Sequence, residues 1–111
     1  MVYVDIKEGD GTGTTEDAYV VAASIDVRAR RLCTIHLKNT HVANGLKYKV
    51  LGYTNKDGVI YNTEVDEAAV AGGTTVQIVI TKKLATVELS VKSSVGATPA
   101  TYAHEYLATV M

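Results

Sequence analysis

Three histidines and one cysteine are the side chains of this sequence best suited to metal binding or nucleophilic chemistry. His36, His41 and His104 contain no pair at metal-ligand spacing with a third ligand close in sequence, so no zinc site is predicted. Cys33 is the only cysteine, which excludes an internal disulfide and a cysteine-rich metal site. We therefore interpret the histidines as exposed strand and turn residues, and Cys33 as a small buried thiol.

The segment Gly9–Asp17 combines glycines with oxygen-bearing side chains, as calcium-binding and phosphate-binding loops do. Its candidate ligands are Asp10, Thr12, Thr14, Glu16 and Asp17. A calcium loop needs a fuller oxygen set closed by a bidentate glutamate, and a phosphate loop ends in Lys-Ser or Lys-Thr before a helix. Neither pattern is complete, so we predict a solvated, flexible connector without a cofactor. A cation bound there is the alternative that the sequence leaves open.

Catalytic and nucleic-acid-binding patterns are missing from the rest of the sequence. No serine lies in an elbow of the Gly-x-Ser-x-Gly type, and Cys33 has no supporting histidine pattern. The basic residues at 28–31 and 82–83 lack the interleaved aromatic residues on which bases stack. The sequence thus predicts neither an enzyme nor a nucleic-acid-binding protein, while an acidic partner surface for the basic residues stays open.

Length and charge are those of one small globular domain. A chain of 111 residues can bury about two-thirds of its unfolded surface, enough for one core. Its net charge of -1 provides no general attraction to nucleic acid or an anionic membrane, and no apolar run reaches the length of a membrane helix. The first residues lack the basic and apolar regions of a signal peptide, so synthesis in a cytoplasm is expected.

Short alternating runs separated by turn residues predict an all-β protein. The expected strands are 1–8, 18–27, 31–38, 46–53, 59–65, 74–81, 84–92 and 101–111. Residues 66–71 are predicted to be a loop or one helical turn, and 101–111 also fits a helix. Seven or eight strands favour a single antiparallel β-sandwich of Greek-key or jelly-roll type, with a small β-barrel as the alternative.

The two termini carry the predicted interface. We expect residues 1–17 to form an extended arm with its connector, and 18–111 to form the sandwich domain. Main-chain hydrogen bonds let such an arm add a strand to a neighbour's sheet edge. All seven aromatic residues are tyrosines, which suit interface rims because the ring is apolar and the hydroxyl is polar. The predicted interface residues are Val2, Tyr3, Val4, Ile6, Tyr102 and Tyr106.

Several motifs between residues 31 and 111 resemble those of small β-sandwich virion proteins of tailed phages. They are Lys38-Asn-Thr40, Asn44-Gly45, Lys47-Tyr-Lys-Val-Leu-Gly52, Ala71-Gly-Gly73 before Val76, and Val87–Ser94 before a Gly-Ala-Thr loop. The resemblance implies a non-enzymatic structural role in a virion, in head decoration, capsid cementing or a tail. It also implies symmetric homo-oligomers and partners such as a capsid protein. The net charge and the lack of a long apolar run predict neither nucleic acid nor a membrane as a partner.

A binding module for a carbohydrate or a protein ligand is the alternative function. Exposed tyrosines can stack on sugar rings, as aromatic residues of such modules do. The absence of tryptophan counts against this alternative. The leading expectation is therefore a structural subunit that assembles through its sheet edges and its N-terminal arm.

Overall fold

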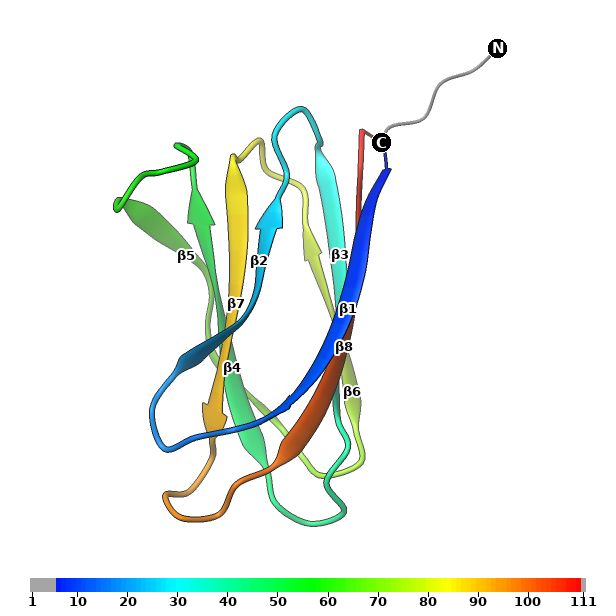
Figure 1. Cartoon of the computed structure of the whole chain (residues 1–111), viewed down its shortest axis with the longest axis vertical. Coiled ribbons are helices and arrows are strands. Elements are labelled where there is room, and N and C mark those ends of the chain that lie inside the picture. The colour runs from blue at the N-terminus through cyan, green and yellow to red at the C-terminus, as the bar shows by residue number, and fades with distance from the viewer. Residues whose placement is uncertain (1–5, 111) are drawn as a thin grey trace.

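Two four-stranded antiparallel sheets pack face to face in the computed structural model, which describes residues 6–110 (Figure 1). The first sheet has the strand order β1-β8-β3-β6, and the second has the order β2-β7-β4-β5. The strands are β1 (Ile6–Thr14), β2 (Val20–Asp26), β3 (Leu32–Asn39), β4 (Leu46–Tyr53), β5 (Tyr61–Val70), β6 (Thr75–Ile80), β7 (Thr86–Ser93) and β8 (Thr101–Thr109). Within residues 6–110, no helix is long and apolar enough to cross a membrane.

The strand pairs are nested like a long hairpin that has been rolled up. β4 pairs with β5, β3 with β6, β2 with β7, and β1 with β8. Rolling brings β8 beside β3 and β7 beside β4, and both contacts are antiparallel. This is the jelly-roll arrangement, so the predicted sandwich is confirmed, and the two separate sheets exclude the barrel alternative.

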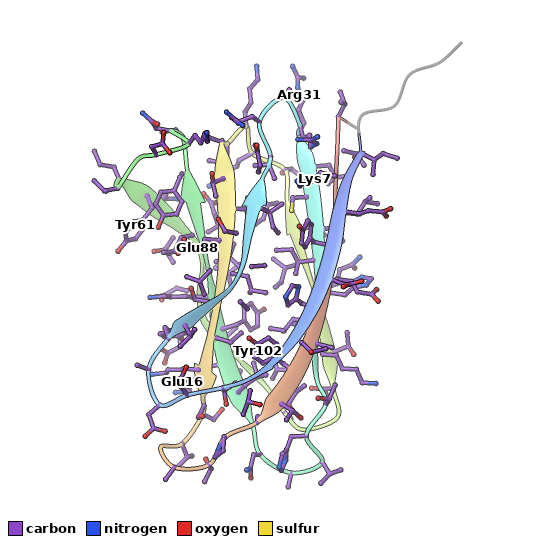
Figure 2. The ribbon with its side chains drawn as sticks, viewed as in Figure 1. Lys7, Glu16, Arg31, Tyr61, Glu88 and Tyr102 are labelled. Atoms are coloured by element: carbon purple, nitrogen blue, oxygen red, sulfur yellow. The ribbon has the colours of Figure 1, made fainter. Side chains whose placement is uncertain are left out.

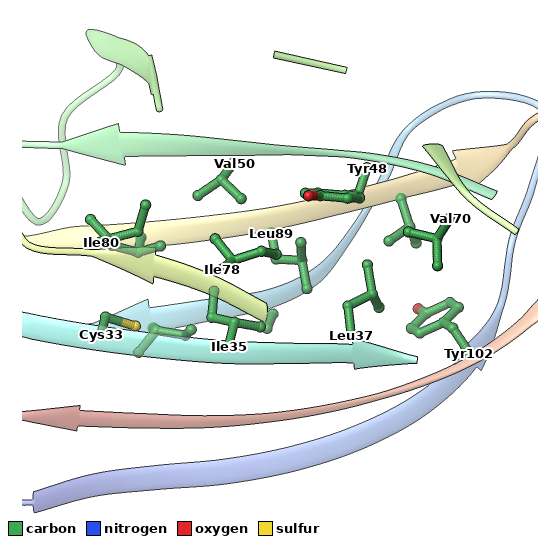
Figure 3. Close-up of a cluster of buried hydrophobic side chains, with 14 of the residues drawn as sticks. Cys33, Ile35, Leu37, Tyr48, Val50, Val70, Ile78, Ile80, Leu89 and Tyr102 are labelled. Carbon is green, nitrogen blue, oxygen red and sulfur yellow. The ribbon is translucent and has the colours of Figure 1, made fainter. Parts of the chain in front are cut away.

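Alternation of side chains along the strands builds the core between the sheets (Figure 3). In β3, Cys33, Ile35 and Leu37 point inward as predicted, and all three are buried. Val50 of β4 and Leu89 of β7 cover them from the opposite sheet. Burying each such aliphatic side chain stabilises the fold by about 1.5–3 kcal/mol, which makes this layer the main source of stability.

Two segments that we predicted to be irregular are strands. Gly9–Thr14 was expected to be a flexible connector, but it forms most of β1 and pairs with β8 along its whole length. Residues 66–71 were expected to be a loop or helical turn, but β5 runs through to Val70. The strand continues through a bulge. Tyr48 pairs with Ala68 and Val50 pairs with Val65, so β5 has one more residue than β4 between these two pairs. In both cases pairing with a neighbouring strand outweighs the local preference.

Candidate interaction surfaces

Three glycines on the inner side of β1 lie under three rings of β8. Alternate residues of a strand share a face, so a Gly-x-Gly-x-Gly run can face a Tyr-x-His-x-Tyr run residue by residue. The partners are Gly9 with Tyr106, Gly11 with His104, and Gly13 with Tyr102. A Cβ atom at Gly11 would lie 2.7 Å from His104 Nε2, too close for any side chain to fit without movement. The glycines are therefore needed so that the rings can lie against the backbone of β1.

His104 is held inside this ring column, which corrects our interpretation of it as an exposed residue. Its ring lies between Tyr102 and Tyr106, with centroids 6.4 and 6.5 Å away and nearly parallel planes. Only 6% of the residue is exposed, and its Nδ1 atom has no hydrogen-bond partner within residues 6–110. Burial lowers the pKa of His104, and a hydrogen bond to the backbone of Ala22 acts against this effect. The imidazole is therefore neutral at neutral pH.

The residues predicted to form an interface are divided between the interior, the surface and the segment before β1. Tyr102 is buried between the two sheets and Tyr106 is half-buried, both packed on the glycines (Figure 2). Ile6 begins β1, pairs with Thr109 and is 51% exposed. Val2, Tyr3 and Val4 lie outside the described residues. The two tyrosines thus have an interior role, and an interface role for any of these six residues stays a prediction.

The outer face of the first sheet is a shallow concavity of about 700 Å³ with a row of polar residues across its middle. Asp10 of β1 pairs with Glu105 of β8, Glu105 with His36 of β3, and His36 with Gln77 of β6. Like charges on directly opposed residues are destabilising, so Asp10 beside Glu105 costs folding energy. Such a row can accept hydrogen bonds from hydroxyl or ammonium groups. Residues 6–110 contain no group of three or more His, Cys, Asp or Glu able to hold a metal.

The outer face of the second sheet carries a cluster of opposite character around Tyr19. Lys49 Nζ lies 4.4 Å from the ring centroid and Lys92 Nζ 5.1 Å away, both at cation–π distance. The Tyr19 hydroxyl donates to Glu67 Oε2 over 2.9 Å, and Lys47 Nζ lies 3.3 Å from Glu67 Oε1. Burial and this hydrogen bond raise the pKa of Tyr19 to about 12. Because Glu67 sits in the bulge of β5, the bulge directs its carboxylate onto this face.

The basic end of the sandwich consists of the connections 27–31, 54–60 and 81–85. Figure 1 shows these three connections together at one end of the long axis. They contain six lysines and arginines and a single carboxylate, Asp57. Arg28 pairs with Asp26 and Lys82 with Glu64, each over 2.7 Å, whereas Arg31, Lys56 and Lys83 have no ion pair within residues 6–110. The fold thus gathers the basic residues at 28–31 and 82–83 with Lys56 at one end of the sandwich.

The acidic end consists of the connections 15–19, 40–45, 71–74 and 94–100 at the other end of the long axis (Figure 1). It contains Glu16, Asp17 and no lysine or arginine. Figure 2 shows Arg31 and Glu16 at opposite ends of the molecule. Asn39, fully buried, supports this end by donating from Nδ2 to the carbonyls of Asn44 and Val70 over 2.8 and 3.0 Å.

Among residues 6–110, the most exposed large apolar residues lie at the two ends. Val59 and Ile60 are 86% and 84% exposed at the basic end, immediately before Tyr61 of β5. Val42 and Val95 are 92% and 64% exposed at the acidic end. Monomeric proteins tolerate single exposed apolar residues, but pairs of them at both ends of an elongated molecule indicate surfaces that could be covered.

Comparison with known proteins finds similar folds, but it identifies no family. No protein-family model matches the sequence, and no curated protein matches it. Among solved structures, the chain is similar to PirA, with a TM-score of 0.66 and 12% identity over 87% of this chain and 92% of that one. It is also similar to a subunit of Bacillus endospore appendages, described as disulfide-linked pili, with a TM-score of 0.61 and 12% identity over 97% and 89% of the two chains.

A third similar structure is the VP2 subviral particle of infectious bursal disease virus. The TM-score is 0.54 and the identity 11%, over 96% of this chain and 32% of that chain. At identities this low, the likeness shows a shared β-sandwich fold and nothing about chemistry.

The ring column and the acidic end are features that sequence reasoning missed. The matching signal for the ring column was present as Gly9-x-Gly-x-Gly13 and Tyr102-x-His-x-Tyr106, two period-two runs of equal length. The acidic end has no comparable signal, because its residues come from connections scattered along the chain.

Proposed function

We propose that this chain is a non-enzymatic structural subunit of a virus particle. In this role it assembles with its own copies and with other virion proteins, as a capsid decoration or cementing protein or another small capsid or tail component. The jelly-roll fold supports the proposal, since solved structures with this fold include a viral capsid subunit and a pilus subunit. The motif resemblance to tailed-phage virion proteins points in the same direction.

The observation that carries the proposal is the free edge of β5. At ten residues β5 is the longest strand, and within residues 6–110 it pairs only with β4. Its second half is interrupted by the bulge at Asp66 and Glu67, a device that protects sheet edges. A second register shift falls between Thr63 and Val65, so the regular part of this edge is Tyr61–Thr63, beside exposed Val59 and Ile60. A free edge with an apolar start is suited to pairing with another chain.

The N-terminal arm is the second part of the proposal. Val2, Tyr3 and Val4 precede β1 in the sequence, and their role in this proposal is to add a strand to a neighbour's sheet edge. Removal of residues 1–5 leaves Ile6–Thr14 of β1 intact. We expect that truncation to keep the thermal stability and to weaken assembly, measured by native mass spectrometry.

The edge is tested by placing lysines on it. The variant Ile60→Lys with Tyr61→Lys adds charge at the apolar start of β5, which should weaken association at least tenfold in sedimentation velocity. Leu107→Lys is the control, because Leu107 is exposed on the central strand β8 rather than on an edge. A wild-type protein that stays monomeric at every concentration and binds glycans would contradict the proposal.

A binding module is the second candidate, supported by the concavity on the first sheet. The carboxylates of Asp10 and Glu105 line this concavity, are exposed, and can accept hydrogen bonds from the hydroxyl groups of a ligand. If this role holds, a glycan array should detect binding that Asp10→Asn with Glu105→Gln abolishes, while the protein stays monomeric.

A further inference from the structure

The two ends of the sandwich are complementary to each other. We propose that copies of this chain join end to end along the long axis, with the basic end of one copy docked on the acidic end of the next. This inference rests on the proposed structural role, because its partner is a second copy of the chain. It assigns the docking surface to the connections at the ends, which share Val59 and Ile60 with the start of the β5 edge.

Charge supplies the first argument. Arg31, Lys56 and Lys83 are exposed and have no ion pair within residues 6–110, so their charges face solvent. At the other end, exposed Glu16 and Asp17 meet no lysine or arginine of the same end. Like ends therefore repel and unlike ends attract, which selects a head-to-tail contact over a symmetric one.

Apolar exposure supplies the second argument. In the described part of the chain, the four large hydrophobic residues with the highest exposed fractions divide equally between the ends. Val59 and Ile60 lie at one end, and Val42 and Val95 lie at the other. A head-to-tail contact would bring the two pairs to the same interface. Removing them from water would then contribute to affinity, with the charges setting the orientation.

The acidic end is also preorganised, which limits the entropy lost on docking. Hydrogen bonds join its connections to one another: Asn44 Nδ2 donates to the Pro99 carbonyl, and the Ala97 N–H donates to Asp17 Oδ1, both over 2.9 Å. The Ser94 N–H donates to the Gly45 carbonyl over 3.2 Å. Loops held in this way present a fixed surface, and less ordering is needed when a partner binds.

The geometry of the contact determines the kind of assembly. Two different surfaces on one subunit form a heterologous contact, which builds open chains or rings rather than closed dimers. The molecule measures 49 × 32 × 17 Å, so each end offers about 500 Å² to a partner, near the lower limit of a specific interface. Association should therefore be weak, concentration-dependent and sensitive to salt.

Reversing the charge of each end separately tests the inference. The first variant carries Arg31→Glu, Lys56→Glu and Lys83→Glu. The second carries Glu16→Lys and Ala43→Lys, and leaves Asp17 intact because its carboxylate accepts the Ala97 N–H. Sedimentation velocity over a concentration series should show at least tenfold weaker association for each variant alone. A mixture of the two should recover to within threefold of wild type, because each variant's altered end complements the other's.

The control changes charge away from both ends, through Glu105→Lys and Gln77→Lys in the middle row of the outer face of the first sheet, with the same charge change as the second variant. This variant should associate like wild type. If wild type associates but the end variants associate equally well, or the control is weakened as much as they are, the end-to-end contact is overturned while the structural role stands. If wild type is monomeric at all concentrations, the structural role and the contact fail together.

Discussion

Strands β1 and β5 are both the outermost strand of a sheet, but they are stabilised in different ways. β1 has three glycines on its inner side and depends on the rings of β8 to fill the space above them. β5 has few buried residues of its own, with Val70 the only fully buried one, and follows β4 through a bulge. An edge strand can thus be fixed by what covers its inner face, or be left with exposed surface for a partner.

The three glycines of β1 make this strand intrinsically less stable than β5. A glycine within a strand is less favourable than alanine by about 0.5–1 kcal/mol, so three of them weaken β1 considerably. The rings compensate, because each aromatic side chain buries a large apolar surface against the bare backbone. The prediction for β1 is therefore intolerance of any side chain at the glycines, whereas β5 should tolerate changes at its exposed start.

The largest effect is expected at Gly11. In Gly11→Val the new side chain collides with the His104 ring, and we expect a loss of about 3 kcal/mol in the free energy of unfolding. Thr12→Val, one residue on and exposed, places the same side chain on the outer face and should change stability by less than about 0.5 kcal/mol. Urea denaturation measures both. Equal effects at the two positions would show that the ring column does not hold β1.

An intermediate effect is expected from the pH dependence of His104. Burial lowers its pKa in the folded state, so folded and unfolded chains are both neutral here above the ordinary value of about 6.5. Below that pH the unfolded chain binds a proton first, and stability falls until the pH passes the folded pKa. Wild type should therefore lose more Tm between pH 7.5 and pH 5 than His104→Phe, with His36 and His41 common to both. Parallel Tm curves would contradict a buried, neutral His104.

The smallest effect on stability is expected at the start of β5. Ile60→Ser should change the free energy of unfolding by less than about 0.5 kcal/mol, because the side chain is already in water. The same substitution at buried Ile78 should cost about 4 kcal/mol. Thermal and urea denaturation compare the two. A large loss at Ile60 would mean that β5 depends on its exposed start, and the contrast with β1 would disappear.

The sequence alone determined the periodic part of the fold. Alternation in Cys33–Leu37, Leu46–Val50 and Val76–Ile80 predicted both the strands and their inward faces, because a side-chain period of two is a local property. The ambiguous run at the C-terminus was also predicted correctly as a strand, now β8. What these patterns share is that each strand's own residues reveal which face is buried.

Tertiary structure alone decided the rest. Gly9–Gly13 looks like a loop until Tyr102, His104 and Tyr106 are set across from it, since nothing local rewards glycine in a strand. Asp66–Ala71 has helix-forming residues and becomes a strand only because β4 is there to pair with it. The opposite charges of the two ends arise only when the jelly roll gathers seven separate connections, because charge density on a surface depends on which distant segments lie together.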